Sequence, residues 1–358
     1  MADDLLLLTN DDVAGILDIS GCMAALERAY LAMARGKSVE RPRSQTRVPL
    51  DEPDVTYCFK SMEGALLGDG YMTLRITSDA VFEGKVNGRA RREKLARGPG
   101  GTYCGLIFLF STRDVAPVAL IHDGLIQLAR VACTSALSVQ LLAREDAGDL
   151  ALIGAGEQAW WHLKAAATVR RLRRVRVYGP TPARRAALAA RARDELGLAA
   201  EAVATAQQAV SGADIVIAAT NASEPVLDGR WLAPGTHVVS IVSGDKGSTR
   251  RELDDETMCR AALVVAHSKA GAIEHRNGDL AGPVAAGLLS WEKIIDLPDL
   301  VAGDSPRRRS REEITVFKNN GGMGLQFAAV APAVYERARK AGIGRSLPAA
   351  WFMESMPS

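Results

Sequence analysis

The stretch LALIGAGEQAWWHLKAAA places two glycines and an alanine in the spacing G-x-G-x-x-A, at Gly154, Gly156 and Ala159. An apolar run precedes this turn, and an alanine-rich, helix-forming run follows it without a break. In such a turn the first glycine permits a tight bend, the second lets a pyrophosphate approach the backbone, and the small third residue lets helix and strand pack closely. The unpaired N–H groups of the following helix then face the phosphates. The stretch therefore predicts a dinucleotide site, with Glu157 and Gln158 in the first helical turn; the alternative is a glycine bend that serves packing only.

The kind of nicotinamide cofactor depends on how the second strand of this unit ends. Sites for NAD usually carry an Asp or Glu there, which holds the ribose 2′-hydroxyl. Here the strand RVRVY is followed by Gly179. Thr181, Arg184 and Arg185 come next, and they can bind a 2′-phosphate through charge-assisted hydrogen bonds. The sequence thus favours NADP(H), and NAD(H) stays open if both arginines are solvated helix residues.

Strand-like and helix-like segments alternate through the middle of the chain. We expect strands at 149–153, 174–178, 213–220, 236–242 and 262–267, the last of them ending the series, and helices at 157–171 and 182–196. Several strand segments are continuous apolar runs, which is typical of a parallel sheet covered on both faces. The expected fold class is α/β, a doubly wound Rossmann sheet. Thr220 and Asn221 end one of these strands, and we assign both to the cofactor.

Both ends of the chain predict a second, α+β unit. We expect a helix near 20–36, β-like runs at YMTLRIT and GLIFLF, and a helix at 128–143. The basic, glycine-rich segment 83–101 predicts a solvated loop or lid, and SPRRRSR a surface loop. The segment ITVFKNNGGMGLQFAAVAPAVYERARKAG predicts a second glycine turn that leads into a long return helix. We therefore divide the chain into residues 1–127, 128–315 and 316–358, the middle part being the Rossmann domain.

The composition narrows the classes of partner. The 358 residues hold 44 Lys and Arg against 42 Asp and Glu, a net charge of +2 that is too small to favour nucleic acid or anionic lipid as the main partner. We see no apolar run that approaches the roughly 20 residues that span a bilayer, and the start MADDLLLLTNDD lacks the basic flank of a signal peptide. The five cysteines form no C-x-x-C pair, and the five histidines show no metal-ligand spacing. We expect a cytoplasmic protein without a membrane, nucleic-acid or metal partner.

Five stretches together resemble the ornithine cyclodeaminase/mu-crystallin family: IQLARVACTSAL, LALIGAGEQA, ADIVIAATNASEPVLDGRWLAPGTHVVSI, RRELDDE and EITVFKNNGG. The resemblance covers most of the chain. It implies a Rossmann domain inserted into a substrate and dimerisation domain, which residues 1–127 and 316–358 would form, and it implies a homodimer. It also implies hydride transfer between a nicotinamide and the carbon of a C–N bond, usually beside a carboxylate.

The resemblance also assigns roles to three arginines. Arg43 in RPRSQTRVP and Arg130 in LARVACTS match the family's two carboxylate-binding arginines, whose paired N–H groups suit a carboxylate. We expect Arg130 near a helix start, where the helix dipole supports an anion, and Arg47 is close enough to replace Arg43. The family's active-site lysine falls at Arg75 in YMTLRITSD. A guanidinium holds an anion but does not readily shuttle a proton, and the alternative for Arg75 is an exposed strand residue.

Three further groups are candidates for handling the proton. Lys60 and Lys85 offer an amine near Arg75, although neither is in the matching position. Asp245 in SIVSGDKGSTRRELD lies in the region where cyclodeaminases of the family carry an aspartate for the substrate amine, one residue out of step. We expect Asp245 to be an acid/base or amine-holding residue, and the alternative is an acidic turn residue.

These features favour an NAD(P)H-dependent oxidoreductase acting on a C=N/CH–NH bond of a small carboxylic substrate, most simply an imine or ketimine reductase or an amino-acid dehydrogenase. In this hypothesis Arg43, Arg75 and Arg130 bind substrate, and Asp245 or water protonates the nitrogen. Arg75 and Asp245 are then the catalytic candidates. One alternative is ornithine cyclodeaminase using NAD, which Arg75 weakens. The other, which Arg75 favours, is a non-catalytic, mu-crystallin-like binding protein.

Overall fold

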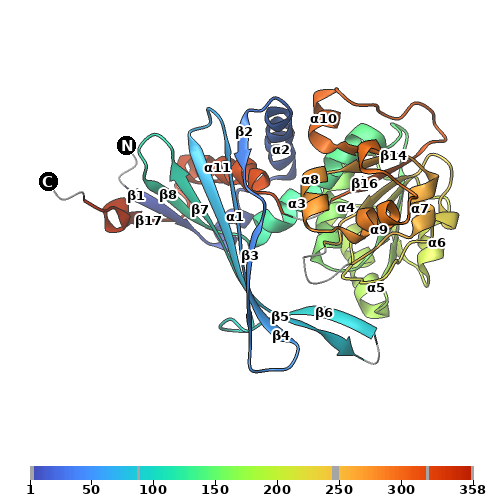
Figure 1. Cartoon of the computed structure of the whole chain (residues 1–358), viewed down its shortest axis with the longest axis horizontal. Coiled ribbons are helices and arrows are strands. Elements are labelled where there is room, and N and C mark those ends of the chain that lie inside the picture. The colour runs from blue at the N-terminus through green and yellow to red at the C-terminus, as the bar shows by residue number, and fades with distance from the viewer. Residues whose placement is uncertain (1–3, 87–88, 244–249, 320–321, 356–358) are drawn as a thin grey trace. The chain divides into compact units, whose positions relative to one another are not determined.

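The chain divides into two compact units, and each is described by itself. A computed structural model describes residues 4–86, 89–243, 250–319 and 322–355 (Figure 1). Unit 1 comprises Met1–Arg130 and Gly322–Ser358, and unit 2 comprises Val131–Gly321. The first division falls within helix α3 (Gly124–Leu142), and the second lies just before helix α11 (Gly324–Ala341).

Unit 2 is built on a parallel sheet. In the described part of the chain the sheet has eight strands in the order β11-β10-β9-β12-β13-β16-β14-β15, and the neighbouring strands run parallel. The strands are β9 (Asp149–Ile153), β10 (Arg174–Tyr178), β11 (Ala200–Ala202), β12 (Ile215–Ala218), β13 (His237–Ser240), β14 (Ala261–Ala266), β15 (Ile294–Asp296) and β16 (Ile314–Lys318). The order reverses between β9 and β12, and in open α/β sheets ligands bind at such a switch point.

Helices connect the strands of unit 2. They are α4 (Glu157–Val169), α5 (Pro182–Leu196), α6 (Ala206–Val210), α7 (Asp255–Arg260), α8 (Lys269–Glu274), α9 (Gly278–Ala285) and α10 (Leu297–Ala302), with short turns η1 (Gly229–Trp231) and η2 (Trp291–Lys293). A buried apolar cluster that includes Val216, Val238 and Val316 fills the space beside the sheet. The expected α/β class with a Rossmann-type sheet is confirmed.

One strand of this sheet departs from the expected series. The expectation that residues 262–267 form the last strand is wrong, because β15 and β16 follow β14. The segment ITVFK is β16, which is fully buried and pairs with both β13 and β14. Its place in the sheet, between β13 and β14, does not follow from its place in the chain, after β15, so the sequence alone does not indicate that it is a strand of this sheet. The boundary expected at residue 315 falls inside β16.

Unit 1 is built on a mixed sheet that two helices cover. In the described residues it has nine strands, seven of them in the order β17-β1-β8-β7-β5-β4-β2, with β3 added beside β4 and β6 beside β5. They are β1 (Asp4–Leu8), β2 (Ser38–Glu40), β3 (Ser44–Pro49), β4 (Val55–Leu66), β5 (Tyr71–Val86), β6 (Arg89–Leu95), β7 (Cys104–Ser111), β8 (Pro117–His122) and β17 (Arg345–Pro348). The helices are α1 (Asn10–Ala14), α2 (Ile19–Ala34), the first part of α3, and α11, with a last turn η3 (Ala349–Phe352). Helix α11 packs on β4, β5 and α2.

The segment expected as a basic loop is largely a β-hairpin arm. Strand β5 runs on to Val86 and pairs antiparallel with β6, so the loop assignment is wrong for most of residues 83–95 (Figure 1). Opposite charges face each other across the two strands: Arg92 Nε donates to Glu83 Oε1 at 2.8 Å. The charged residues therefore pair across strands rather than only facing solvent, which is the sheet equivalent of a helical ion pair.

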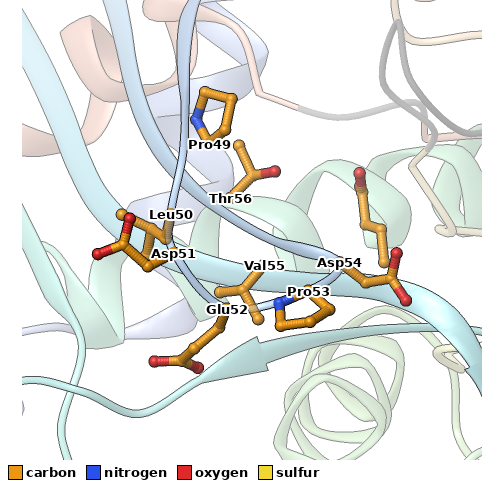
Figure 2. Close-up of a pocket in the computed structure, with 9 residues that line it drawn as sticks. Pro49, Leu50, Asp51, Glu52, Pro53, Asp54, Val55 and Thr56 are labelled. Atoms are coloured by element: carbon orange, nitrogen blue, oxygen red, sulfur yellow. The ribbon is translucent and has the colours of Figure 1, made fainter.

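A hollow of about 450 Å³ lies at the turn between β3 and β4, lined by residues 49–56 and Glu83 (Figure 2). Four of its nine lining residues are acidic, and two of these carboxylates are ion-paired, Glu52 to Arg97 and Glu83 to Arg47. Because arginines of the same unit already neutralise two of these carboxylates, we assign no binding or catalytic role to this hollow.

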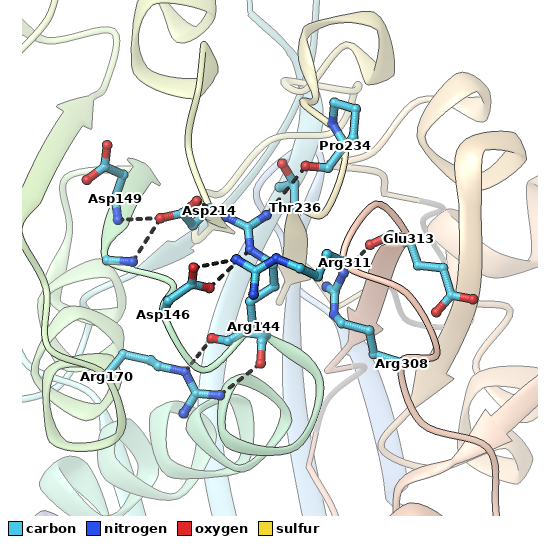
Figure 3. A network of polar contacts seen from close by, with 12 residues as sticks. Arg144, Asp146, Asp149, Arg170, Asp214, Pro234, Thr236, Arg308, Arg311 and Glu313 are labelled. Carbon is cyan, nitrogen blue, oxygen red and sulfur yellow. Dashed lines mark hydrogen bonds and ion pairs between the residues drawn. The ribbon is translucent and has the colours of Figure 1, made fainter.

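The basic segment SPRRRSR is an irregular surface segment, as expected, but two of its arginines are bound into unit 2. Arg308 Nε donates to the carbonyl of Leu142 at 2.8 Å, and Arg311 pairs with Asp146 at 2.5 Å. Asp214 joins the same region, where it accepts from the backbone N–H groups of residues 148 and 149 (Figure 3). The two arginines thus attach this segment to the end of α3 and to the turn that precedes β9, and Asp214 binds the start of β9.

Helix α3 is long and apolar enough to cross a membrane by length and composition, contrary to the expectation that no such segment exists. Of its most apolar 18-residue window, 72% is buried within the protein. A helix that is apolar on all sides is typical of a core helix as well as of a membrane span, and the burial favours the core helix.

Candidate functional site

The glycine turn after β9 has the geometry that close approach of a ligand requires. Gly154 has a φ of +122°, and a Cβ at this position would lie 2.2 Å from the carbonyl oxygen of Ala219. Only glycine fits there, because such a φ is strained for other residues and the neighbouring backbone leaves no room. Gly156 is the N-cap of α4 and supplies no side-chain cap, and a Cβ there would meet nothing within 4 Å. The first N–H groups of α4 are therefore open to an anion.

A cleft of about 650 Å³ lies beside this turn at the switch point of the sheet. It is lined by residues 153–156, Gln158, residues 178–181, Arg184, residues 219–222 and Val226. The cleft brings together seven of the residues predicted for the cofactor: Gly154, Gly156, Gln158, Thr181, Arg184, Thr220 and Asn221. Glu157 and Ala159 are elsewhere: Glu157 pairs with Arg191 on the surface, and Ala159 is fully buried under the turn.

The two arginines after β10 have different surroundings. Arg184 is exposed and lines the cleft. Arg185 instead donates to the carbonyl of Gly179 at 2.8 Å and lies over the ring of Tyr178, 5.9 Å from its centroid. A Cβ at Gly179 would lie 3.2 Å from the Cβ of Ala155, so an acidic side chain here would press on the glycine turn. Arg184 is therefore free to meet a ligand phosphate, whereas Arg185 shapes the loop.

A buried carboxylate, Glu252, holds the strand ends that border the cleft. Glu252 is fully buried and accepts from Thr220 twice, from the backbone N–H at 2.6 Å and from Oγ1 at 2.7 Å. Its other oxygen accepts from the backbone N–H groups of Ile241 and Val242 at 2.9 and 2.8 Å. Glu252 thus ties the end of β12 to the end of β13 and fixes Thr220 at the cleft. The prediction did not include it, although it lies in the quoted motif RRELDDE.

The dinucleotide expected from the sequence fits this cleft. The volume, the open N-terminus of α4 and the glycine that a Cβ would block all suit a pyrophosphate, and Arg184 suits an additional phosphate. Within the described residues no group of three or more His, Cys, Asp or Glu side chains is arranged to hold a metal ion.

Unit 1 gathers charged residues on the face of its sheet that α11 covers. Side chains alternate between faces along a strand, and along β5 the buried positions include Arg75, Thr77 and Asp79. Arg75 is 5% exposed, so the alternative of an exposed strand residue is wrong. Its Nε and Nη2 donate to one oxygen of Asp123, Oδ2, at 2.9 and 2.5 Å. Oδ1 of Asp123 has no hydrogen-bond partner among the described residues.

Arg130 lies in the same buried group, held by two amides. Its Nη2 donates to Gln127 Oε1 at 2.8 Å, and its Nη1 donates to Gln326 Oε1. Gln326 in turn donates to the hydroxyl of Tyr30 at 2.8 Å. Burial, together with the nearby positive charge of Arg75, lowers the pKa of Arg130 to about 9. The helix starts at Gly124, so Arg130 lies in its second turn and the expected help from the helix dipole does not apply.

Both guanidinium groups lie over one aromatic ring. The Cζ atoms of Arg75 and Arg130 are 5.3 and 5.2 Å from the ring centroid of Phe327 in α11. A cation near an aromatic face gains roughly 0.5–2 kcal/mol, which offsets part of the cost of burying it. The carboxylate of Asp123 is bonded to Arg75, whereas the described hydrogen bonds of Arg130 go to the neutral amides of Gln127 and Gln326, so this pair of desolvated guanidiniums favours a small anion.

The remaining candidates fall at different distances from this group. Arg43 is half-buried, and its positive charge lowers the pKa of both Lys60 and Arg130, so it is close to both. Arg47, the alternative to Arg43, is exposed and paired with Glu83. Lys85 belongs to β5, where nothing is described of its side chain, and Asp245 lies outside the described residues. Asp123, Gln127 and Gln326 were not predicted, since an Asp before a helix and two glutamines within helices carry no local signal of function.

Comparison with known proteins gives one family. The sequence model of the ornithine cyclodeaminase/mu-crystallin family matches residues 4–342. The Delta(1)-pyrroline-2-carboxylate reductase of Paracoccus denitrificans is 38% identical over 302 residues, which are 84% of this chain and 89% of that protein.

Two solved structures are similar over nearly the whole chain. The Delta(1)-pyrroline-2-carboxylate reductase of Thermococcus litoralis in complex with NADH and L-proline aligns with a TM-score of 0.83 and 27% identity, over 96% of this chain and 100% of that one. The iminosuccinate reductase of Paracoccus denitrificans in complex with NAD+ aligns with a TM-score of 0.77 and 28% identity, over 96% and 99%.

Proposed function

The chain belongs to the ornithine cyclodeaminase/mu-crystallin family. We propose that it is an NAD(P)H-dependent imine reductase in which unit 2 binds the cofactor and unit 1 binds the substrate carboxylate. The protein is an oxidoreductase that acts on the C=N/CH–NH bond of a small carboxylic substrate, as its relatives named above do. The observation that supports these separate roles is that unit 1 buries the guanidiniums of Arg75 and Arg130 over the ring of Phe327, whereas unit 2 contains the nucleotide cleft.

The residues of each unit have separate roles in this proposal. In unit 2, Gly154, Gly156 and the start of α4 hold the pyrophosphate, and Thr220 borders the cleft. When bound, the reduced nicotinamide supplies the hydride for the substrate carbon. In unit 1, Arg130 and Arg75 hold the substrate carboxylate, and Arg43 adds positive charge. Asp245 stays a prediction as a residue that holds the substrate amine.

The cofactor preference is a finer proposal. We infer that NADP(H) binds more tightly than NAD(H), because Arg184 is exposed at the cleft and Gly179 supplies no carboxylate to repel a 2′-phosphate. The relatives whose structures are described above are in complex with NADH or NAD+, so this preference would set the chain apart from them. Thr181 lines the same side of the cleft and adds a hydroxyl to the proposed phosphate site.

A homodimer is supported by the other face of the unit 1 sheet. Leu74 and Ile76 of β5 and Phe108 and Phe110 of β7 point to the face opposite Arg75, and all four are only half-buried. An apolar sheet face of this kind favours burial against a second copy. Light scattering should give twice the mass of the chain, and Phe108→Glu should yield the monomer; a monomeric wild type would contradict this. We also propose that the protein is cytoplasmic.

The experiment for the function is a substrate panel. Cyclic imines that carry a carboxylate, and 2-oxo acids mixed with ammonia or methylamine, are offered with NADPH and with NADH, and loss of the reduced-cofactor absorbance is followed. We expect turnover with at least one carboxylate-bearing imine and none with its ester, which lacks the anion. Tight cofactor binding without turnover of any imine would instead favour the non-catalytic binding protein.

A further inference from the structure

Lys60 is a buried lysine on the same sheet face as the arginine group. On β4, Lys60 pairs with Thr77 of β5, and the next position on that face, Met62, pairs with Arg75. Two residues along a strand span about 7 Å, so Lys60 lies one step along the face from Arg75. The residue is 8% exposed. A lysine is rarely buried to this extent unless it is paired or functional.

The polar groups around Lys60 leave hydrogen-bonding capacity open. The one partner described for its ammonium is Asp79 Oδ2, at 3.6 Å, which is longer than a hydrogen bond. Neither Asp79 Oδ2 nor the hydroxyl of Thr77 has a hydrogen-bond partner among the described residues. An ammonium has three donors, and buried polar atoms are nearly always satisfied by protein, water or ligand. This part of the face therefore suits a small polar ligand.

The charges that face Lys60 come from three segments of the chain. Asp79 on β5 opposes it at 3.6 Å, Lys94 and Arg92 lie on β6, and Arg43 precedes β3. The thiol of Cys58 lies two residues away on the same face of β4. Burial lowers the pKa of Lys60 to about 8, with Asp79 acting in the opposite direction and the three cations adding to the decrease. Lys60 can thus gain and lose a proton near neutral pH.

Arg75 is less suited to this work. A guanidinium does not readily shuttle a proton, and two of the N–H groups of Arg75 are already committed to Asp123. Neighbouring positions on one sheet face thus have different roles. Arg75 is a cation held in place by Asp123, and Lys60 is an ammonium that can exchange its proton.

We propose that Lys60 is the proton donor to the substrate nitrogen, with Asp79 as its positioning residue; this rests on the proposed imine reduction. The hydride forms the new C–H bond at the imine carbon, and the electron pair of the C=N π bond forms an N–H bond with a proton from Lys60 Nζ. The substrate gains two electrons and two hydrogens, and Lys60 becomes a neutral amine that takes a proton from solvent. In amine oxidation the neutral Lys60 accepts the proton.

The first test is the pH profile of steady-state kinetics. For wild type, the kcat of reduction should fall above about pH 8, where Lys60 loses its proton, and the kcat of oxidation should rise there. Lys60→Arg keeps the charge but cannot release its proton, so kcat should fall by about 10²–10⁴-fold, KM should change little, and the limb near pH 8 should disappear. Wild-type kcat and an unchanged limb in Lys60→Arg would overturn the proposal.

Lys94→Gln is the matched control. Lys94 Nζ donates to the other oxygen of Asp79 at 2.8 Å, but its side chain is 43% exposed. Removing its charge should leave kcat at low pH unchanged and move the limb to higher pH, because Lys94 lowers the pKa of Lys60. If Asp245→Asn removes the limb while Lys60→Arg keeps it, the donor is Asp245 and the proposal fails.

A second readout does not depend on turnover. Trace acetylation of the wild-type protein across pH, followed by mass spectrometry, measures the pKa of each lysine and its protection by L-proline with NADH. Lys60 should titrate near pH 8 and be protected, whereas Lys94 should be unprotected. Titration of Lys60 above pH 10, or labelling that proline and NADH do not slow, would overturn the assignment. Failure of the proposed function is separate: wild type would reduce no imine at any pH.

Discussion

Each unit buries a cluster of charges, and the two clusters differ in how completely they are paired. In unit 2, Lys318 and Asp279 are fully buried 2.7 Å apart, and Lys318 also donates to Ser240 Oγ and to the carbonyl of Val242. In unit 1, among the residues that the structure describes, Asp123 and Asp79 each have one oxygen without a hydrogen bond, and the described partner of Lys60 is that oxygen of Asp79, at 3.6 Å. A buried charge without a partner is costly unless a ligand completes it.

The difference separates a structural cluster from a binding one. The cluster around Lys318 and Glu252 has its ligands within the chain, so it fixes the strand ends that border the nucleotide cleft. In the cluster around Arg75 and Arg130, Asp123 is bonded to Arg75 and the described hydrogen bonds of Arg130 go to neutral amides, so the cluster favours an incoming anion. Substitutions should therefore damage folding in unit 2 and catalysis in unit 1.

The largest expected effect is on the stability of unit 2. Lys318→Met leaves Asp279 buried without its cation, which should lower the free energy of unfolding by about 3–5 kcal/mol. Thermal and denaturant unfolding measure this. The double variant Lys318→Met/Asp279→Leu should recover part of the loss, because no charge is then stranded. A single variant as stable as wild type would show that this cluster is not the structural one.

Arg130→Ala should act on catalysis rather than on folding. Loss of one charge-assisted contact to a buried carboxylate should cost about 2–4 kcal/mol of transition-state binding, or about 30- to 1000-fold in kcat/KM. The affinity for the cofactor should barely change, as titration would show. Arg130→Lys should recover little, because an ammonium lacks the planar two-point grip. An active Arg130→Ala, or one inactive only because it is unfolded, would remove the distinction between the clusters.

A smaller effect is expected at the exposed edge of the nucleotide cleft. Arg184→Ala should weaken NADPH binding by about tenfold, or roughly 1.4 kcal/mol, and leave NADH binding unchanged, since only NADPH carries the 2′-phosphate. Arg185→Ala is the matched control, because Arg185 instead donates to the carbonyl of Gly179 and lies over the ring of Tyr178. Calorimetric titration of both cofactors measures the effect. Equal losses for both cofactors would contradict a phosphate role for Arg184.

The smallest effect concerns a carboxyl at the edge of unit 1. Burial raises the pKa of Glu40 from its ordinary value of 4.5 to about 7. The folded protein then holds a proton that the unfolded chain has lost, so the stability from this group is present at low pH and is lost as the pH rises through about 7. Glu40→Gln stays neutral, and its Tm should exceed that of wild type at about pH 8 but not at about pH 5. An equal Tm difference at both pH values would disprove the shift.

The nucleotide cleft was the more predictable of the two regions. Its glycine turn and the strands on either side of it lie within residues 149–178, so one local pattern predicts them. Thr220 and Asn221, which also line the cleft, stand at the end of a later apolar strand segment. Glu252 was missed because its partners at Thr220 and Val242 are set by the sheet, not by neighbours in sequence.

The group in unit 1 was predictable only in part, because its members come from distant segments. Arg75 and Arg130 were named from the resemblance, but the burial of Arg75 and its bond to Asp123 depend on the pairing of β5 with β7. The β5–β6 arm is not evident from the sequence, because its many charged residues are typical of a solvent-exposed loop. The pair Asn87-Gly88, which separates the paired residues Val86 and Arg89, was the available hairpin signal.

The most direct measurement follows a labelled hydride into the product. Delta(1)-pyrroline-2-carboxylate is incubated with the protein and with NADPH or NADH deuterated at the transferred position of nicotinamide C4, and the product is analysed by mass spectrometry and NMR. An imine reductase predicts proline that carries one deuterium, at Cα, and the yield should fall strongly in Arg130→Ala. Absence of any reduced product, both from this imine and from the other carboxylate imines of the panel, or proline without deuterium at Cα, would contradict the account.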